Sequence, residues 1–113
     1  MSDIFVDADA CPVKQEIYRV AKRYALRVTV VSNSWMRIPC ESWLELVVVK
    51  ELFDAADDWI VEHVIESDIV ISGDIPLAAR CLPKGAHVID PRGRVFTEDG
   101  IGAALASREL LSH

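Results

Sequence analysis

Aspartates stand directly after short apolar runs of this 113-residue sequence, where carboxylates could share a cation; they are Asp7, Asp9, Asp74 and Asp90. If Asp7 and Asp9 are extended, the two-residue period of a strand places both on one side, roughly 7 Å apart. Crowded carboxylates repel each other unless a cation is present, and an all-oxygen ligand set suits Mg²⁺ or Mn²⁺. Such a site can polarise a phosphoryl oxygen and activate water. The pattern therefore indicates metal-assisted phosphoryl chemistry.

A second group of acids opens the amphipathic run 54–66 and consists of Asp54, Asp57 and Asp58. At spacings of three and four residues, these side chains lie on neighbouring faces of a helix. A purely structural interpretation also stands, in which Asp54 is the N-cap and Asp57 completes a capping box.

Similar structural alternatives apply to two of the acids that follow apolar runs. Asp74 could be only the N-cap of the next helix, and Asp90, which precedes Pro91, could be only a turn residue. Asp7 and Asp9 have no capping role that both could fill, so they are the strongest candidates for a site.

The elements that must position these acids alternate along the chain. Apolar runs rich in β-branched residues predict strands at 4–6, 28–32, 46–49, 68–72 and 86–89, and amphipathic runs predict helices at 12–24, 54–66, 75–82 and 100–111. Strands that are apolar on both faces and alternate with helices are typical of a parallel sheet covered on both sides. We therefore predict one three-layer α/β/α domain over residues 1–113, with a mainly parallel sheet of about five strands.

Ligands of open parallel sheets bind beyond the carboxyl ends of the strands, where the strand order reverses. The first strand should therefore lie beside the fourth, because only that neighbour relation brings Asp7 and Asp74 to one site. The connection 35–45 is too short for us to expect a full helix there.

The first predicted helix has two contrasting sides. Helical spacing predicts an apolar stripe made of Val13, Ile17, Val20, Ala21 and Tyr24. The opposite side carries Lys14, Arg19, Lys22, Arg23 and Arg27, which form either a solvated face or a phosphate-binding surface. Three tryptophans could stack on bases or pack in the core, namely Trp35, Trp43 and Trp59.

Composition narrows the classes of protein. Eighteen acidic against 12 basic residues give a net charge of −6, which argues against a dedicated basic nucleic-acid binder. It does not exclude an enzyme whose bound cations reverse the local field. Three widely spaced cysteines form neither a disulfide framework nor a zinc motif. No apolar run approaches the length of a membrane span, and the first residues do not resemble a signal peptide, so we expect a cytoplasmic protein without membrane contact.

Four blocks carry a family resemblance: IFVDADACPVK at 4–14, FDAADD at 53–58, SGDIPLAA at 72–79 and PRG at 91–93. Together they resemble the signature blocks of the bacterial UPF0178 family (YaiI/YqxD, DUF188), which is grouped with PIN-like domains. PIN nucleases carry an acid that ends the first strand, an acid in a later helix and a Ser/Thr-x-Asp after the fourth strand. The corresponding positions here are Asp7, Asp57 or Asp58, and Ser72 with Asp74, while Asp9 is an additional acid of this family.

The leading hypothesis is a PIN-like phosphodiesterase that uses Mg²⁺ or Mn²⁺ on weakly bound RNA or DNA. Its metal ligands would be Asp7, Asp9 and Asp74. Asp57 or Asp58 would be a further ligand or hold a water, and Ser72 would orient Asp74. Phosphate contacts would come from Lys14, Arg80 and Arg92, each near the carboxyl end of a strand.

Two other functions stay open. One is a non-catalytic module that binds metal or nucleic acid, or regulates, without turnover. The other is a HAD-like phosphatase, suggested by Asp7-x-Asp9. The phosphatase motif would require Thr or Val where Cys11 stands and a second aspartate after Gly73-Asp74.

Overall fold

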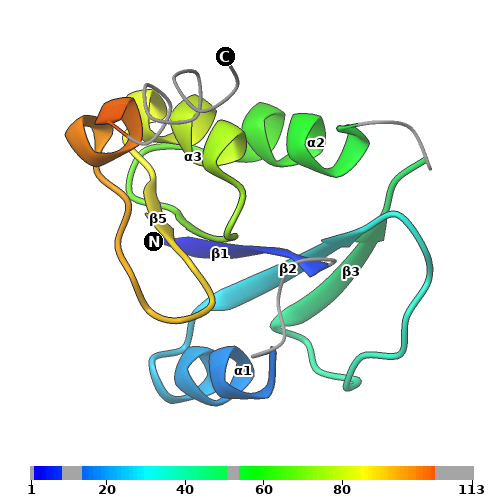
Figure 1. Cartoon of the computed structure of the whole chain (residues 1–113). Coiled ribbons are helices and arrows are strands. Elements are labelled where there is room, and N and C mark those ends of the chain that lie inside the picture. The colour runs from blue at the N-terminus through cyan, green and yellow to red at the C-terminus, as the bar shows by residue number, and fades with distance from the viewer. Residues whose placement is uncertain (1, 9–13, 51–53, 104–113) are drawn as a thin grey trace.

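A computed structural model describes residues 2–8, 14–50 and 54–103 of the chain. Its sheet contains β1 (Asp3–Asp7), β2 (Arg27–Ser32), β3 (Leu44–Val48), β4 (Ile69–Ile71) and β5 (His87–Ile89). The strand order is β3-β2-β1-β4-β5, and each neighbouring pair is parallel (Figure 1). The predicted parallel sheet is confirmed, and so is the pairing of the first strand with the fourth, where the strand order reverses.

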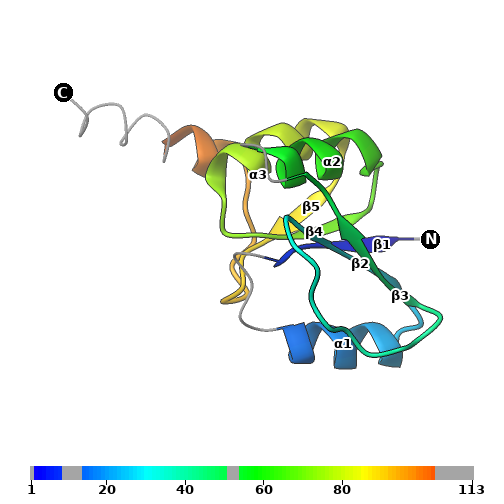
Figure 2. The same ribbon diagram turned by 90° about the vertical axis from the view of Figure 1, so that its right-hand side faces the viewer.

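Helices cover both faces of the sheet. On one face lies α1 (Lys14–Arg23), and on the other lie α2 (Ala55–His63) and α3 (Ile75–Cys81), as Figure 2 shows. A short 3₁₀ turn, η2 (Leu82–Lys84), follows α3, and residues 98–103 are helical. The three-layer α/β/α prediction is confirmed.

The two-residue period of the strands divides the core between the two faces. Phe5 and Val70 pack on the α2 and α3 side with Ile60, whereas the neighbouring residues Ile4 and Val6 pack on the α1 side. Because β1 is buried on both faces, an acid at its end is held by the most constrained strand of the sheet.

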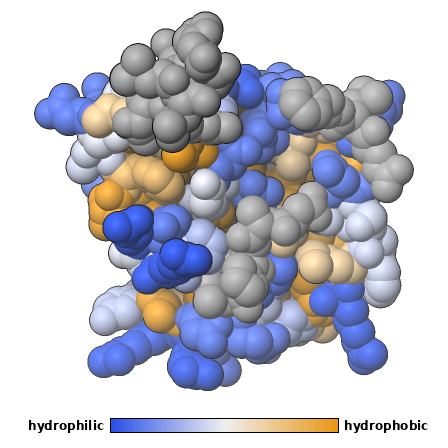
Figure 3. Space-filling view, viewed as in Figure 1, coloured by the Kyte–Doolittle hydropathy of each residue, from blue (hydrophilic) through white to orange (hydrophobic). Residues whose placement is uncertain are grey.

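The buried face of α1 differs from the predicted apolar stripe. Tyr18 and Ala21 are buried, whereas Val20 is 51% exposed and Tyr24 is 62% exposed. The reason is a tertiary contact, because the Tyr18 ring packs edge-on against Trp43, with the ring centroids 6.4 Å apart. Val20 instead lines an open apolar hollow of about 250 Å³ with Ile4 and other side chains of the sheet. Apolar patches are visible among the hydrophilic side chains of the surface in Figure 3.

Element boundaries also differ from the sequence predictions. Strand β3 begins at Leu44 instead of 46, and residues 33–43, all of them described, contain no helix. Met36 and Ile38 from this connection pack against the α1-side core. Helix α2 ends at His63, because Val64 adopts an extended conformation. For the predicted closing helix, residues 104–111 lie outside the described residues.

Candidate acidic site at the carboxyl edge of the sheet

The register between β1 and β4 brings Asp7 and Ser72 together. Val6 is level with Ile71, so the next residues, Asp7 at the end of β1 and Ser72 just after β4, lie side by side. The Ser72 hydroxyl donates a hydrogen bond to Asp7 Oδ2 at 2.9 Å. Both residues are buried, with exposures of 0% for Ser72 and 7% for Asp7. One oxygen of the Asp7 carboxylate is therefore fixed by the neighbouring strand.

The same hydroxyl also contacts the third acid of the sequence motif. The backbone N–H of Asp74 donates to Ser72 Oγ at 3.0 Å. Ser72 thus lies between the Asp7 carboxylate and the Asp74 backbone. Its hydroxyl accepts a hydrogen bond from the Asp74 N–H and donates one to Asp7.

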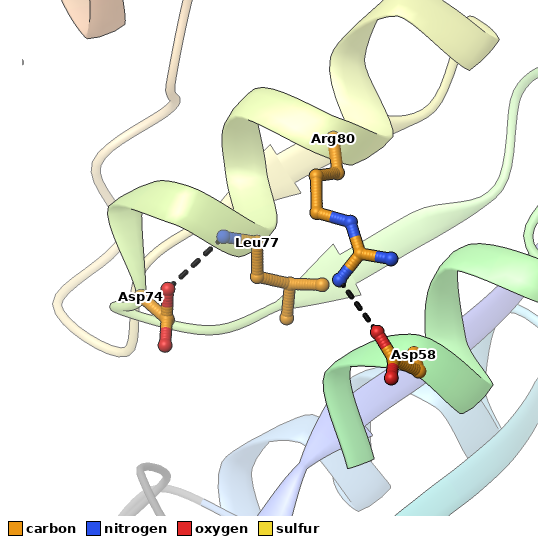
Figure 4. A network of polar contacts seen from close by, with 4 residues as sticks. All are labelled: Asp58, Asp74, Leu77 and Arg80. Carbon is orange, nitrogen blue, oxygen red and sulfur yellow. Dashed lines mark hydrogen bonds and ion pairs between the residues drawn. The ribbon is translucent and has the colours of Figure 1, made fainter. Parts of the chain in front are cut away.

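Asp74 is the N-cap of α3. Its backbone is extended, and Oδ1 accepts the Leu77 N–H at 3.0 Å (Figure 4). Pro76 occupies the first turn, where its missing N–H costs no helical hydrogen bond. The capping interpretation is confirmed. A carboxylate has about four acceptor positions, so one capping bond does not exhaust Asp74.

Asp57, in the first turn of α2, interacts electrostatically with Asp74 and Asp7. The pKa of Asp57 is raised from an ordinary value of 3.8 to about 6. The largest cause is burial, followed by the negative charges of Asp74, Asp7 and Asp54, whereas Arg80 lowers the pKa. Carboxylates from β1, α2 and α3 therefore share one electrostatic environment at the point where the strand order reverses.

Asp58 has a different environment from its neighbour. Its Oδ1 lies 2.8 Å from Arg80 Nη1, and the resulting ion pair joins the exposed surfaces of α2 and α3 (Figure 4). The sequence left Asp57 and Asp58 as equal candidates. Asp57 is the better supported candidate, because the charges of Asp74 and Asp7 help to raise its pKa.

The predicted capping box at the start of α2 is wrong. Asp54 occupies the N-cap position in a left-handed conformation, with φ 62° and ψ 12°, and its side chain makes no capping hydrogen bond. Its backbone carbonyl instead accepts the Asp58 N–H at 2.8 Å. The Asp54 side chain is exposed and acts on Asp57 through its charge.

The donor set bears on whether a cation fits. Among the residues that the structure describes, no three His, Cys, Asp or Glu side chains converge closely enough to hold an ion by themselves. Asp9, a predicted ligand, lies outside the described residues. Carboxylate oxygens from Asp7, Asp57 and Asp74 fit Mg²⁺ better than a soft metal. Because Mg²⁺ usually keeps several waters and takes only one or two carboxylates, a loose acidic cluster suits it.

The predicted phosphate-binding residues occupy three different places. Lys14 is the first residue of α1 and is half-buried, whereas Arg80 is paired with Asp58. Arg92 lies exposed in the turn after β5, where its N–H donates to Asp90 Oδ1 at 2.9 Å. The same oxygen accepts the Arg94 N–H. The turn interpretation of Asp90 is therefore confirmed.

One buried acid was not singled out in the sequence. The Asp68 carboxylate accepts the backbone N–H groups of Asp3 and Ile65, at 3.0 and 2.9 Å. Asp68 immediately precedes β4, at the amino ends of the parallel strands, whereas Asp7 lies at their carboxyl ends. Its position just before an apolar run was the sequence signal that could have indicated a buried acid. Its hydrogen bond with the Asp3 N–H fixes the start of β1.

Comparisons with known proteins agree on one family. Residues 5–113 match the family model described as "Uncharacterized BCR, YaiI/YqxD family". A UPF0178 protein of Rhodospirillum centenum is 60% identical over 111 residues, which cover 98% of this chain and 72% of the relative. UPF0178 proteins of Gluconacetobacter diazotrophicus and Agrobacterium fabrum are 58% and 54% identical, again with 72% of each relative covered.

No solved structure matches the chain. Within the described part of the chain, no helix has the length and apolar character that crossing a membrane requires.

Proposed function

The chain belongs to the YaiI/YqxD family, and on that premise we propose that it is a divalent-metal-dependent phosphodiesterase acting on RNA or DNA. One observation carries the proposal: burial and the negative charges of Asp74 and Asp7, which come from other elements, raise the pKa of Asp57 to about 6. Gathering carboxylates from three elements lowers the stability of the fold unless a cation offsets their charge. A cluster of acids that lowers the stability of the fold, placed where the strand order of the sheet reverses, is typical of a functional site.

Each acid has a distinct proposed role. Asp7 and Asp74 bind a Mg²⁺ or Mn²⁺ ion, together with Asp9 as a predicted ligand. The cation supplies charge neutralisation and polarisation of the phosphoryl oxygen. Asp57 holds the attacking water and accepts its proton, because its carboxylate lies close enough to Asp74 and Asp7 for their charges to act on it.

The remaining residues position these acids. Ser72 is a positioning residue, since its hydroxyl holds Asp7 Oδ2 and accepts the Asp74 N–H. Arg80, held beside the acids by Asp58, is the candidate for phosphate contact nearest to Asp57, as its effect on the pKa of Asp57 indicates.

The test is a cleavage assay on single-stranded RNA and DNA in Mn²⁺, with wild type, Asp57→Asn and Asp58→Asn purified in the same way. Loss of a general base costs about 10²–10⁴-fold in rate, so Asp57→Asn should lose at least about a hundredfold of the cleavage rate. Asp58→Asn, which removes the neighbouring carboxylate and releases Arg80 from its ion pair, should lose much less of the cleavage rate than Asp57→Asn does. Equal rates for wild type and Asp57→Asn would show that this cluster does not perform the chemistry.

A second candidate, cation binding without turnover, has one observation in its favour. The net charge of −6 opposes the binding of a polyanionic substrate but not the binding of a cation. This function predicts a melting temperature that rises with Mn²⁺ while no substrate is cleaved. The cleavage assay combined with melting curves separates the two functions.

A further inference from the structure

A cavity of about 220 Å³ lies between α1 and the connection that leads into β3. Gln15, Tyr18, Arg19 and Lys22 line it from one side of α1, and Glu41 and Trp43 line it from the connection. The spacing of Gln15, Arg19 and Lys22 places them along a single stripe of the helix. The cavity is on the α1 face of the sheet, whereas Asp57 and Asp74 come from elements of the other face.

The lining combines an aromatic ring with two cations. Arg19 and Lys22 are exposed, and Trp43 is half-buried. The Trp43 ring is braced by the edge-on Tyr18 ring at 6.4 Å, so its orientation is fixed by the core. A fixed aromatic ring beside cationic side chains can stack on an unpaired base while the cations contact the adjoining phosphates.

The size and charge of the cavity favour a nucleotide over other anionic ligands. Pockets for drug-sized molecules occupy about 300 Å³ or more, so this smaller space suits one planar base. Glu41 at the same cavity can accept a hydrogen bond from a base amino group. An acidic peptide such as oligoglutamate offers no planar ring to stack on Trp43.

The sheet register gives the separation between the cavity and the acidic site. Ile4, Val28 and Leu44 are level across three neighbouring strands, so Trp43 lies just before that level and Asp7 three residues beyond it. A rise of about 3.3 Å per residue and a strand spacing of about 4.8 Å place the two residues about 16 Å apart in the plane of the sheet. A stacked strand advances about 3.4 Å per nucleotide, so about five nucleotides cover this distance, and the passage from one face of the sheet to the other requires more.

We propose that this cavity binds one base and its adjoining phosphates of a single-stranded RNA or DNA whose scissile bond lies at the acidic site. The inference rests on the proposed function and deepens it, because it names single strands as the substrate class. A duplex conceals the faces of its bases, so it cannot stack on Trp43. The basic side chains of Arg19 and Lys22 also explain how a chain of net charge −6 attracts a polyanion.

The test measures binding without cleavage. Fluorescence anisotropy with a labelled oligoadenylate of about ten nucleotides covers both sites and is run in EDTA at about 0.1 M salt. The uncompensated acids repel the strand equally in wild type and in the cavity variants, so differences in Kd between them report the cavity. A hairpin duplex of the same length and an oligoglutamate peptide are the comparison ligands.

Three variants locate the binding surface. The double substitution Arg19→Glu with Lys22→Glu should raise Kd for the single strand at least about tenfold, because two phosphate contacts are reversed in sign. Arg23→Glu is the matched control on the same helix, since Arg23 stacks over Tyr24 instead of lining the cavity, and it should change Kd less than about twofold. Trp43→Leu should raise Kd at least about fivefold, and Trp43→Phe should restore most of the affinity. Circular dichroism spectra check that each variant is folded.

The outcomes separate this inference from the proposed function. If the Arg19 and Lys22 variant binds like wild type, or if the hairpin or oligoglutamate binds as well as the single strand, the cavity is not a single-strand site. That result leaves the effect of Asp57→Asn on cleavage intact. Conversely, loss of single-strand affinity in this variant supports the cavity even if no cleavage is detected, whereas the proposed function then fails.

Discussion

Substituting Asp57 by asparagine should stabilise the metal-free protein at neutral pH. Burial and the charges of Asp74 and Asp7 raise the pKa of Asp57 to about 6, so the folded state disfavours its charged form. Asparagine keeps nearly the same shape and carries no charge. The substitution therefore removes a repulsion that the fold otherwise tolerates.

The sign and the size follow from the pKa values. Between about pH 4 and pH 6 the folded state binds more protons at Asp57 than the unfolded state does, so the free energy of unfolding falls as pH rises through this window. A shift of about two pKa units corresponds to about 3 kcal/mol. Because Asp57 is only half-buried, solvent screening reduces this figure to about 1–2 kcal/mol. At about 4 °C for each kcal/mol in a domain of this size, the melting temperature should rise by about 4–8 °C.

Thermal unfolding followed by circular dichroism in EDTA measures this effect. The difference between Asp57→Asn and wild type should be full at about pH 7.5 and much smaller at about pH 4, where Asp57 is protonated in the folded wild type. Asp58→Asn is the control, and because it breaks only a surface ion pair with Arg80, it should change stability by less than about 1 kcal/mol. A melting temperature of Asp57→Asn at or below that of wild type at about pH 7.5, or a gain that does not depend on pH, would refute the reasoning.

Three further substitutions test the positioning of the site and the backbone around β5. Ser72→Ala removes a buried hydroxyl that contacts Asp7 and Asp74, so it should destabilise the fold by about 1–3 kcal/mol in urea unfolding; it should also lower kcat with little change in KM. Gly85→Ala should cost about 1–3 kcal/mol in urea unfolding. Gly85 has φ +85°, and a new Cβ would lie 2.9 Å from Glu66 Cγ. Gly93→Ala, with φ +95° and nothing within 4 Å, should cost less.

Much of the fold could be predicted from the sequence because its signals are local. Alternating apolar and amphipathic runs indicated the parallel sheet, and the acids after the first and fourth runs indicated that β1 lies beside β4. The buried face of α1 could not be predicted in the same way. Ile17 and Ala21 fit a stripe with Val20 as well as one with Tyr18. The contact between Tyr18 and Trp43, far apart in the chain, selects the second stripe.

The site shows the same limit at the level of single residues. Spacing along α2 made Asp57 and Asp58 equal candidates, because adjacent residues of a first turn both lie near the helix N-terminus. The packing of α2 against α3 separates them, since it brings Arg80 to Asp58. Likewise, the position of Asp54 before an amphipathic run is typical of a capping residue. Only the structure shows that its backbone is left-handed and that its side chain does not cap the helix.

The two hydrogen bonds of Ser72 have a mechanical consequence. They fix the end of β1 to the first turn of α3 at contacts of 2.9 and 3.0 Å, so Asp7 and Asp74 move as one rigid piece. Asp57 comes from α2, which is joined to α3 on its exposed surface through the Asp58–Arg80 ion pair. Any adjustment of the site to ligands of different size should therefore occur as a displacement of α2 relative to Asp7 and Asp74. Asp57 is the acid whose position would change.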